Sequence, residues 1–453
     1  MNVPRSIFRQ YDVRGLVGPE LTPELARGLG RAYATIGWQR LGRAPVLAVG
    51  RDNRPSGEAL AAAVRAGIAE TGATAVDVGQ LPTPALYFAV HALGTDGGLQ
   101  VTGSHNPPEF NGFKMVLTGD SLHGEEILRL YDIIMLEQWR TGVGRETADG
   151  SVLGKYREAI VARHALRRRV KVVVDCGNGV GSLIAVATLE ALGAEVIPLF
   201  CESDGTFPNH HPDPTVMENL RDLQGEVRRS GAELGIAFDG DADRIGAVDE
   251  NGAVVYGDQL LILYGRDAVA RFGPGLSVIF DVKCSEVLPQ ALRAAGAVPE
   301  MWKTGHSLIK ARMKELHAPL AGEMSGHMFF GGDWFGFDDA LFAAARLLEI
   351  VSAGKGGLAA LLADRPRTYA TPEIRVDCAE ERKFSLVAEA VKHFGSRYPV
   401  NPIDGVRMTF PNGWGLVRAS NTQPILVLRF EATDEASLAA YQGEVMEWLR
   451  ANP

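Results

Sequence analysis

One short loop carries a serine in a setting suited to phosphoryl transfer. Residues 102–114 read TGSHNPPEFNGFK, so Ser104 stands between a glycine and His105, and Lys114 closes the stretch. An Asn-Pro turn held by local side-chain hydrogen bonds would explain the serine without any chemistry. An exposed hydroxyl on a glycine-adjacent loop with basic neighbours is also what a phosphate-accepting nucleophile requires. The loop alone leaves both interpretations open.

A second loop carries three alternating aspartates and suggests a metal site. In FDGDADR, residues 238–244, the apolar run ELGIAF leads into Asp239, Asp241 and Asp243. This spacing lets a tight turn present three carboxylates to one hard cation. A calcium-binding EF-hand loop also begins with alternating acids, but here its closing glutamate is absent and the flanks are predicted strands. We therefore expect one Mg²⁺, with a position open for a phosphate oxygen and with the guanidinium of Arg244 beside it.

The loop GEMSGH, residues 322–327, offers groups suited to a sugar. Glu323 and Ser325 can accept and donate hydrogen bonds to adjacent hydroxyls, and His327 can move a proton near neutral pH. As an isolated string it is also compatible with an ordinary polar loop.

The loop RASNTQP, residues 418–424, lies between two predicted strands and offers groups suited to a phosphate. Its guanidinium, two hydroxyls and amide belong to Arg418, Ser420, Asn421 and Thr422. A hairpin turn and a phosphate site are compatible interpretations of this stretch.

Three similar units of structure are predicted to position these loops. The runs PVLAVGRDNRPSG, KVVVDCGNGVG and LSVIFDVKCSE each begin as a buried strand and turn into a helix, and a glycine and a second strand follow each helix. Such strand, helix, strand units form right-handed parallel crossovers. Because parallel sheets bind ligands beyond the C-terminal ends of their strands, loops from separate domains can meet at one site.

The domain boundaries follow from these units. We expect three related mixed α/β domains over residues 1–150, 151–252 and 253–365. Beyond residue 366 the strands are linked by tight turns and end in the amphipathic run SLAAYQGEVMEWLR, which predicts a smaller C-terminal α+β domain over 366–453. A chain of 453 residues is expected to hold roughly three or four domains.

Charge and composition exclude several classes of protein. A net charge of −9 argues against a nucleic-acid partner, which usually needs a basic face. The N-terminus lacks the apolar core of a signal peptide, and no later segment is long and apolar enough to predict a membrane span. Cys176, Cys201, Cys284 and Cys378 show no paired metal spacing and are expected to be reduced thiols that fill the core. A cytoplasmic protein is therefore expected.

Together with YDVRG at 11–15 and KTGHS at 303–307, the four loops resemble the α-D-phosphohexomutase superfamily, and most closely its bacterial phosphomannomutase/phosphoglucomutase branch. In this resemblance TGSHNP matches the phosphoserine loop, DGDADR the metal loop, GEMSGH the sugar loop and RASNTQP the phosphate loop. The resemblance implies that the four domains surround a central cleft. The chain departs from the family at Ala242, where a glycine is common.

The resemblance also implies a mechanism. Ser104 would be phosphorylated and would pass its phosphoryl group to a hexose monophosphate, giving a hexose 1,6-bisphosphate that turns around and returns its other phosphate. Mg²⁺ on the three aspartates would also contact a phosphate oxygen on Ser104, Arg244 would assist, and glucose 1,6-bisphosphate would act as activator. Lys114, His306 and His327 remain open candidates for proton transfer. The substrate-binding residues implied are Tyr11, Arg14, Lys283, Glu323, Ser325, His327, Arg418, Ser420, Asn421 and Thr422.

Several alternatives remain at this point. Phosphoglucosamine mutases usually carry a glutamine where this chain has Met324, which favours mannose and glucose phosphates as substrates. A metal-dependent sugar phosphatase would use similar groups but must admit water, and a non-catalytic sugar-phosphate sensor should have lost Ser104 or an aspartate of the metal loop. The sequence leaves open whether the protein is a monomer or a homodimer.

Overall fold

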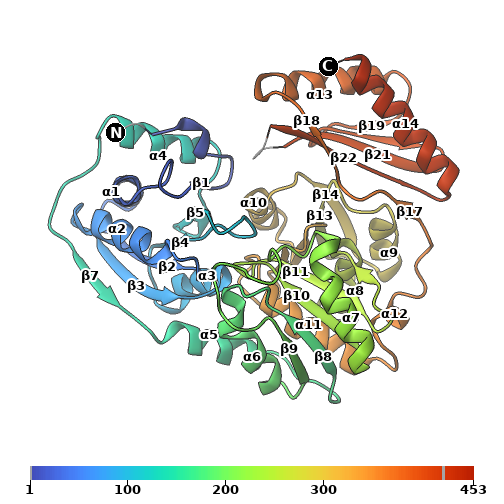
Figure 1. The fold of residues 1–453 in the computed structure, drawn as a ribbon, viewed down its shortest axis with the longest axis horizontal. Coiled ribbons are helices and arrows are strands. Elements are labelled where there is room, and N and C mark those ends of the chain that lie inside the picture. The colour runs from blue at the N-terminus through green and yellow to red at the C-terminus, as the bar shows by residue number, and fades with distance from the viewer. Residues whose placement is uncertain (1–2, 421–423, 453) are drawn as a thin grey trace.

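The computed structural model describes residues 3–420 and 424–452, which form four separate β-sheets with their helices (Figure 1). Three sheets mix parallel and antiparallel strands. In the fourth, nearest the C-terminus, all the strand pairs are antiparallel. The predicted fold class is therefore confirmed, and we number the four domains 1 to 4 along the chain.

Domain 1 contains the first predicted unit. β2 (Val46–Arg51) continues through α2 (Gly57–Ala69) into β3 (Thr74–Gln80), and the two strands pair in parallel. The interior of β2 is buried, as expected for a central strand of a parallel sheet. The other elements are the strands β1 (Val13–Leu16), β4 (Gly97–Val101), β5 (Phe110–Leu117), β6 (Asp120–Ser121) and β7 (Arg145–Ala148), and the helices α1 (Pro23–Leu41), α3 (Thr83–Ala92) and α4 (Glu125–Met135).

Domain 2 contains the second unit. β8 (Lys171–Asp175) leads through α6 (Ala185–Ala191) to β9 (Glu195–Leu199), again in parallel. The other elements are α5 (Val152–Val161), α7 (Arg221–Ser230), β10 (Leu234–Phe238), β11 (Ile245–Asp249) and β12 (Val254–Val255). The strand order across this sheet is β12, β11, β10, β8, β9.

Domain 3 contains the third unit, so all three predicted units of strand, helix and parallel strand are present. β13 (Ser277–Asp281) leads through α9 (Val287–Ala295) to its parallel neighbour β14 (Val298–Trp302). The other elements are α8 (Gly257–Phe272), α10 (His306–Leu316), β15 (Leu320–Gly322), β16 (Met328–Phe330), α11 (Ala340–Ala353) and α12 (Leu358–Leu361).

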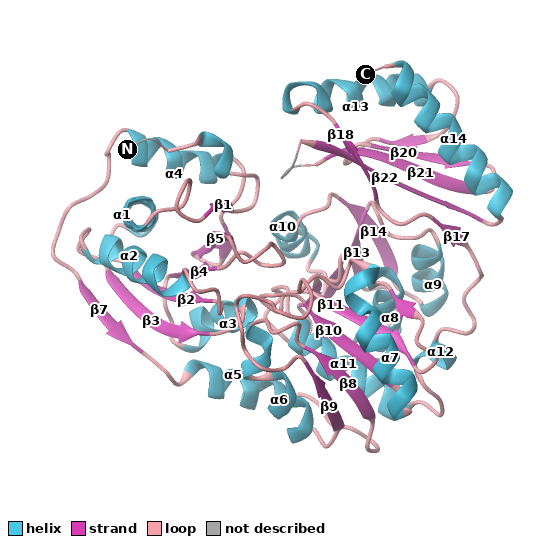
Figure 2. Ribbon diagram, in the orientation of Figure 1, coloured by secondary structure: helices cyan, strands magenta, loops and turns pink. Residues whose placement is uncertain are grey.

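Domain 4 has the predicted strands and C-terminal helix. Its strands are β17 (Tyr369–Ala370), β18 (Ile374–Asp377), β19 (Val400–Asn401), β20 (Val406–Phe410), β21 (Gly413–Ala419) and β22 (Ile425–Ala432). Figure 2 shows α13 (Glu380–Gly395) and α14 (Glu435–Ala451) together on one face of this sheet. α13 was not predicted, although Leu386, Ala390 and Phe394 recur along it at helical spacing and are buried.

The three α/β loops singled out in the sequence occupy equivalent places in their sheets. In each case a parallel strand ends, the loop follows, and the chain returns as an antiparallel neighbour: β4 to β5, β10 to β11 and β15 to β16. The fourth loop lies between β21 and β22, which also pair antiparallel. Three loops therefore leave the C-terminal ends of parallel strands, where sheets of this class bind ligands.

One apolar core joins domains 1, 2 and 3. It includes Phe88 of α3, Tyr156 of α5 and Phe342 of α11, and the rings of Phe88 and Tyr156 lie 5.5 Å apart. Domain 4 has a core of its own, around Phe394 and Phe430. Short 3₁₀ helices occur at Arg5–Ile7, Val180–Leu183 and Met217–Leu220. Among the described residues, no helix combines the length and apolar character that crossing a membrane requires.

Candidate active site

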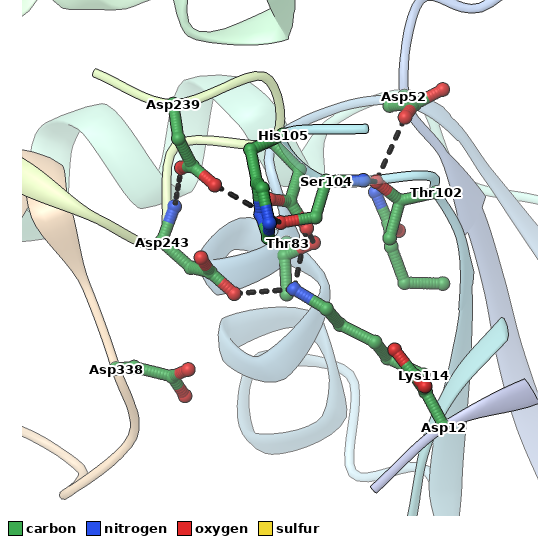
Figure 3. Close-up of polar contacts among 12 residues, drawn as sticks. Asp12, Asp52, Thr83, Thr102, Ser104, His105, Lys114, Asp239, Asp243 and Asp338 are labelled. Carbon is green, nitrogen blue, oxygen red and sulfur yellow. Dashed lines mark hydrogen bonds and ion pairs between the residues drawn. The ribbon is translucent and has the colours of Figure 1, made fainter. Parts of the chain in front are cut away.

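Ser104 lies in the loop after β4 and is only 1% exposed. Its φ of 51° falls in the left-handed region, which residues other than glycine rarely adopt and which is often found at functional sites. A hydrogen bond helps to hold this conformation, because the backbone N–H of Ser104 donates to Thr102 Oγ1 at 2.9 Å. The hydroxyl lies 3.0 Å from Asp239 Oδ2 (Figure 3). The serine was expected to be exposed, but it is buried because it faces the metal loop of domain 2.

Two buried residues that were not predicted hold the serine loop in place. The Arg54 guanidinium donates to the backbone carbonyls of Ser104 at 2.7 Å and Asn106 at 2.6 Å. Asp52 accepts from Arg54 at 3.1 Å and from the Thr102 hydroxyl at 2.8 Å. Burial raises the pKa of Asp52 and lowers the pKa of Arg54, so each charge depends on the other. Their position directly after a buried strand was the only signal in the sequence.

The three aspartates of the metal loop are completely buried and converge on one point. Asp239, Asp241 and Asp243 each offer an oxygen, and these oxygens lie within 4.8 Å of one another. Among the described residues, Asp241 Oδ1 and Asp243 Oδ1 have no hydrogen-bond partner. Burial raises the pKa of Asp239 well above its usual range, and the charges of the other two carboxyls add to the effect. Unpartnered carboxylate oxygens gathered in this way fit a hard cation such as Mg²⁺.

Lys114 forms ion pairs with two of these carboxylates, those of Asp241 and Asp243. Its Nζ donates to Asp241 Oδ2 at 2.7 Å. It also donates to Asp243 Oδ2 (Figure 3). Burial alone would lower the pKa of Lys114, but these two carboxylates raise it above its usual value. A lysine that is held charged cannot accept a proton. Of the three candidates for proton transfer, Lys114 is therefore the least suited to act as a base.

His306 and His327 both face a buried carboxylate, Asp338, which was not predicted. His327 Nε2 accepts a hydrogen bond from Arg244 Nε at 2.9 Å, and its Nδ1 lies 3.2 Å from Asp338 Oδ2. His306 Nδ1 lies 3.8 Å from the same oxygen. Burial lowers the pKa of His306 well below its usual value, and the charge of Lys310 lowers it further. Both histidines remain candidates for proton transfer.

His105 is a further candidate for proton transfer that was not predicted. Its Nδ1 lies 3.2 Å from Ser104 Oγ. Burial lowers the pKa of His105 well below its usual value, and the charge of Arg244 adds to this effect. The ring is therefore neutral at neutral pH, and a neutral imidazole at this distance can accept the serine proton. The signal available in the sequence was its position next to Ser104.

The metal loop and the sugar loop touch through their backbones. The N–H of Ile245 donates to the carbonyl of Gly326 at 3.0 Å. Gly326 has a φ of 94°, and a Cβ at this position would lie 2.2 Å from the Ile245 carbonyl oxygen. Only glycine fits such a contact. The contact therefore fixes the sugar loop of domain 3 against the metal loop of domain 2.

The two predicted sugar-binding side chains lie together in the sugar loop. Glu323 is 3% exposed, and its carboxylate accepts from the Gly305 N–H at 2.6 Å and from the Ser325 hydroxyl at 3.0 Å. The thioether of Met324 lies against the Arg429 guanidinium of domain 4. Met324 is thus engaged with domain 4, whereas Glu323 and Ser325 form one connected polar pair.

Two residues from the YDVRG motif of domain 1 contact other predicted site loops, one in domain 3 and one in domain 1 itself. The Tyr11 hydroxyl donates to the carbonyl of Thr304, in the KTGHS motif, at 2.8 Å. The Arg14 guanidinium donates to the side chain of Asn106, in the serine loop, at 2.9 Å. Both residues therefore contact loops that were predicted to belong to the site.

Lys283 and Arg418 are basic groups at the boundary between domains 3 and 4. Lys283 Nζ lies 3.4 Å from Glu373 Oε2. Arg418 is 6% exposed, and its Nε donates to Asp404 Oδ2 at 3.1 Å. The same oxygen of Asp404 accepts the Thr304 N–H at 3.0 Å. The predicted phosphate loop is thus linked to the KTGHS motif through one carboxylate.

Only part of the predicted phosphate loop is described. Ser420 is buried, its N–H donates to the Ile425 carbonyl at 3.0 Å, and its own carbonyl accepts from Lys383 Nζ at 2.6 Å. Asn421 and Thr422 lie outside the described residues. The geometry of the loop is therefore established only at its two ends.

Comparisons with known proteins agree along the whole chain. Four profiles of the phosphoglucomutase/phosphomannomutase family match in order: α/β/α domain I at 5–140, domain II at 154–252, domain III at 256–369 and the C-terminal domain at 373–447. A phosphomannomutase/phosphoglucomutase of Pseudomonas aeruginosa is 49% identical, with 99% of this chain and 96% of that protein covered. A phosphoglucomutase of Neisseria gonorrhoeae is 44% identical, with 100% and 98% covered.

A solved structure gives the same result for the fold. The crystal structure of a phosphoglucomutase/phosphomannomutase family protein from Burkholderia thailandensis superposes with a TM-score of 0.92 at 42% identity. The match covers 99% of this chain and 98% of that one. The four-domain arrangement is therefore shared over the full length of both chains.

Proposed function

The chain belongs to the phosphoglucomutase/phosphomannomutase family, and we propose that it interconverts hexose 1-phosphates and hexose 6-phosphates through a phosphoserine at Ser104. The observation that carries the proposal is the Ser104 hydroxyl, buried 3.0 Å from Asp239 beside two unpartnered carboxylate oxygens. This arrangement supports a serine that carries a phosphoryl group next to a bound cation. Mannose and glucose phosphates are the proposed substrates, as the names of the relatives from P. aeruginosa and N. gonorrhoeae suggest.

The metal loop would stabilise charge during transfer. Asp239, Asp241 and Asp243 would hold Mg²⁺, which would neutralise charge that develops on the phosphoryl group. Lys114 donates to Oδ2 of Asp241 and of Asp243, which leaves their Oδ1 atoms available to the cation. Arg244 adds a second fixed positive charge.

Proton transfer involves two different hydroxyls. His105 would take the proton of Ser104 when the phosphoryl group returns to the serine, and the imidazolium so formed would give this proton back when the group next leaves. His306 or His327 would take the proton from the attacking sugar hydroxyl. In the second half of the reaction the same histidine would return a proton to the sugar.

Substrate binding is proposed to use the other two loops. Glu323 and Ser325 would bind the O3 and O4 hydroxyls, which stay near the centre when a hexose 1,6-bisphosphate turns around. Arg418 would bind the phosphate that does not react. Since O2 is not bound in this scheme, glucose and mannose become nearly equivalent. Glucose 1,6-bisphosphate is the proposed activator, because it can restore the phosphate on Ser104.

The burial of Ser104 favours a mutase over a phosphatase. A mutase must keep water from the phosphoserine, whereas a phosphatase must admit it. At 1% exposure Ser104 is shielded even without substrate. The relatives that match over the full chain are also named as mutases.

A comparison of substrates tests the proposed function. The values of kcat/KM for glucose 1-phosphate, mannose 1-phosphate and glucosamine 1-phosphate are measured together with the release of inorganic phosphate. We expect similar values for glucose and mannose phosphates, a much lower value for glucosamine phosphate, and little free phosphate. A preference for glucosamine phosphate would identify a phosphoglucosamine mutase, and stoichiometric release of phosphate would identify a phosphatase.

A further inference from the structure

Cys176 and Cys201 stand at the ends of two neighbouring strands in domain 2. β8 and β9 pair in parallel with Asp175 opposite Leu199, and the N–H of Cys176 extends this ladder by donating to the Leu199 carbonyl at 3.2 Å. Cys176 follows β8 directly, and one residue separates β9 from Cys201. Both thiols are free, and their Sγ atoms lie 3.0 Å apart. The sheet therefore holds two thiol sulfurs in contact.

This geometry is close to that of a disulfide. A disulfide bond measures about 2 Å, so the sulfurs need to approach by about 1 Å. Cys176 is fully buried, whereas Cys201 is partly exposed. The contact between the two thiols lowers the pKa of Cys201, and the same contact together with burial raises the pKa of Cys176. Cys201 is therefore the accessible nucleophile, and Cys176 is placed to react second.

We propose that Cys176 and Cys201 form a reversible internal disulfide in the folded enzyme when it meets a low-molecular-weight disulfide, and that this bond weakens the metal site. The Cys201 thiolate attacks one sulfur of the reagent and expels the other half as a thiolate. Cys176 then loses its proton, attacks the Cys201 sulfur and expels the second half. The chain loses two electrons and two protons, and the reagent becomes two thiols.

The link to the metal site runs through the turn that begins at Cys176. The Gly179 N–H donates to the Cys176 carbonyl at 2.8 Å, and the Val180 N–H donates to the Gly240 carbonyl, inside the metal loop, at 3.0 Å. A Cβ on Gly179 would lie 2.8 Å from that Gly240 oxygen, so the two loops are in close contact. A displacement of Cys176 towards Cys201 is therefore transmitted to the loop that carries the aspartates.

The same turn also touches the support of the serine loop. The Asn53 amide donates to the Asn178 carbonyl at 2.7 Å and to the Ser203 hydroxyl at 3.0 Å. Asn53 precedes Arg54, which holds the backbone of the serine loop. The disulfide would thus act where domain 1 and domain 2 meet.

Oxidised glutathione tests the formation of the bond. The folded enzyme is incubated with this reagent, and its mass and non-reduced peptides are analysed. We expect a loss of two hydrogen atoms, a peptide joining Cys176 to Cys201, reversal by dithiothreitol and a melting temperature raised by a few degrees. Cys176→Ser should stop at a mixed disulfide on Cys201, Cys201→Ser should not react at this pair, and Cys378→Ser should behave like the wild type. A wild-type mass that stays unchanged, or that shows only a stable mixed disulfide, would overturn the proposal.

Calorimetric titration with Mg²⁺ tests the coupling, which rests on the proposed metal site. We expect the oxidised enzyme to bind Mg²⁺ several-fold more weakly than the reduced enzyme, and Cys201→Ser to show no change after the same treatment. Equal affinities in the two states of the wild type would overturn the coupling. A reduced wild type that binds no Mg²⁺ would instead count against the proposed metal site, while the mass analysis would still decide whether the disulfide forms.

Discussion

The region around Ser104 and the region around Arg418 are built in different ways. Ser104 and Asp239 are buried to 1% exposure or less, in domains that are joined by one apolar core, although domain 1 also has a core of its own. Domain 4, which carries Arg418, has a separate core and meets domain 3 through a small apolar cluster and polar contacts. In one of these contacts, Arg407 donates to the Cys284 carbonyl at 2.9 Å.

The two regions are suited to different tasks, the first to phosphoryl transfer and the second to substrate binding. Phosphoryl transfer depends on fixed distances among a serine, a cation and a base, which a shared core can maintain. Binding a sugar phosphate in two orientations requires a surface that can adjust, and polar interfaces between domains permit relative motion. We therefore expect substitutions in the first region to abolish chemistry and substitutions in the second to weaken binding.

The largest effect is expected for Ser104→Ala. Removing the proposed phosphoryl carrier should lower kcat on the order of 10⁴-fold or more, because no other group takes its place. Thermal unfolding should be nearly unchanged. Ser352→Ala, at a buried serine of α11, is the control and should keep full activity. Normal turnover by Ser104→Ala would contradict the account of this region.

The next effect is expected for Asp241→Asn. Removing one charged ligand should weaken Mg²⁺ binding by roughly 10- to 100-fold and reduce kcat in parallel, as a titration of activity against Mg²⁺ would measure. Excess chelator should inactivate the wild type, and added Mg²⁺ should restore it. Asp249→Asn changes a buried carboxyl at the far end of β11 and should leave the Mg²⁺ dependence unaltered. Full activity in chelator would rule out the metal role.

Lys114→Met separates an ion-pair role from a role as base. Without its cation, the buried Asp241 and Asp243 repel each other, so the free energy of unfolding in chelator should fall by about 3–5 kcal/mol. Mg²⁺ should recover part of this loss, since it supplies a positive charge to the same carboxylates. Urea unfolding with and without Mg²⁺ measures both effects. A loss of activity with an unchanged free energy of unfolding would instead support Lys114 as the base.

Arg418→Ala tests whether domain 4 serves binding rather than chemistry. Hydrogen bonds to charged groups contribute about 1.5–3 kcal/mol, so KM should rise by roughly 10- to 100-fold while Ser104 is still phosphorylated. Arg375→Ala, in which an exposed guanidinium of domain 4 is removed, should leave KM unchanged. An unaltered KM combined with failure to phosphorylate Ser104 would contradict the division of tasks.

The smallest effect is expected for Ala242→Gly. Ala242 has a φ of 57°, and relieving this conformation should gain about 1 kcal/mol. Its methyl group is buried, and removing it costs about 0.8 kcal/mol. The net change in the free energy of unfolding should therefore stay within about 1 kcal/mol. A larger loss would show that the methyl group has a role in packing the metal loop that these contacts do not explain.

The sequence predicted those features that are encoded in continuous stretches. Each strand and its following loop form one local pattern, so the three crossovers, the aspartate loop and the sugar loop could be identified. Arg54 could not, because its role depends on carbonyls about fifty residues away along the chain. Asp338 was missed for the same reason, since only the fold brings it to His327 and His306.

The proton-transfer residue could not be chosen from the sequence either. Lys114, His306 and His327 were equivalent candidates in the sequence, because each is a basic residue in or near a predicted loop. The structure separates Lys114 from the histidines by its two carboxylate partners. Residue type therefore indicated the chemistry, whereas charge and burial in three dimensions were needed to rank the groups.

A single-turnover experiment tests the central claim most directly. The enzyme is loaded with phosphate from glucose 1,6-bisphosphate, freed of excess reagent and mixed with mannose 1-phosphate. Peptide mapping then follows the phosphate on the protein, and chromatography follows the sugar. We expect phosphate to leave Ser104 as mannose 1,6-bisphosphate appears in equal amount. Phosphate found on another residue, or released from Ser104 as free inorganic phosphate, would contradict the central claim.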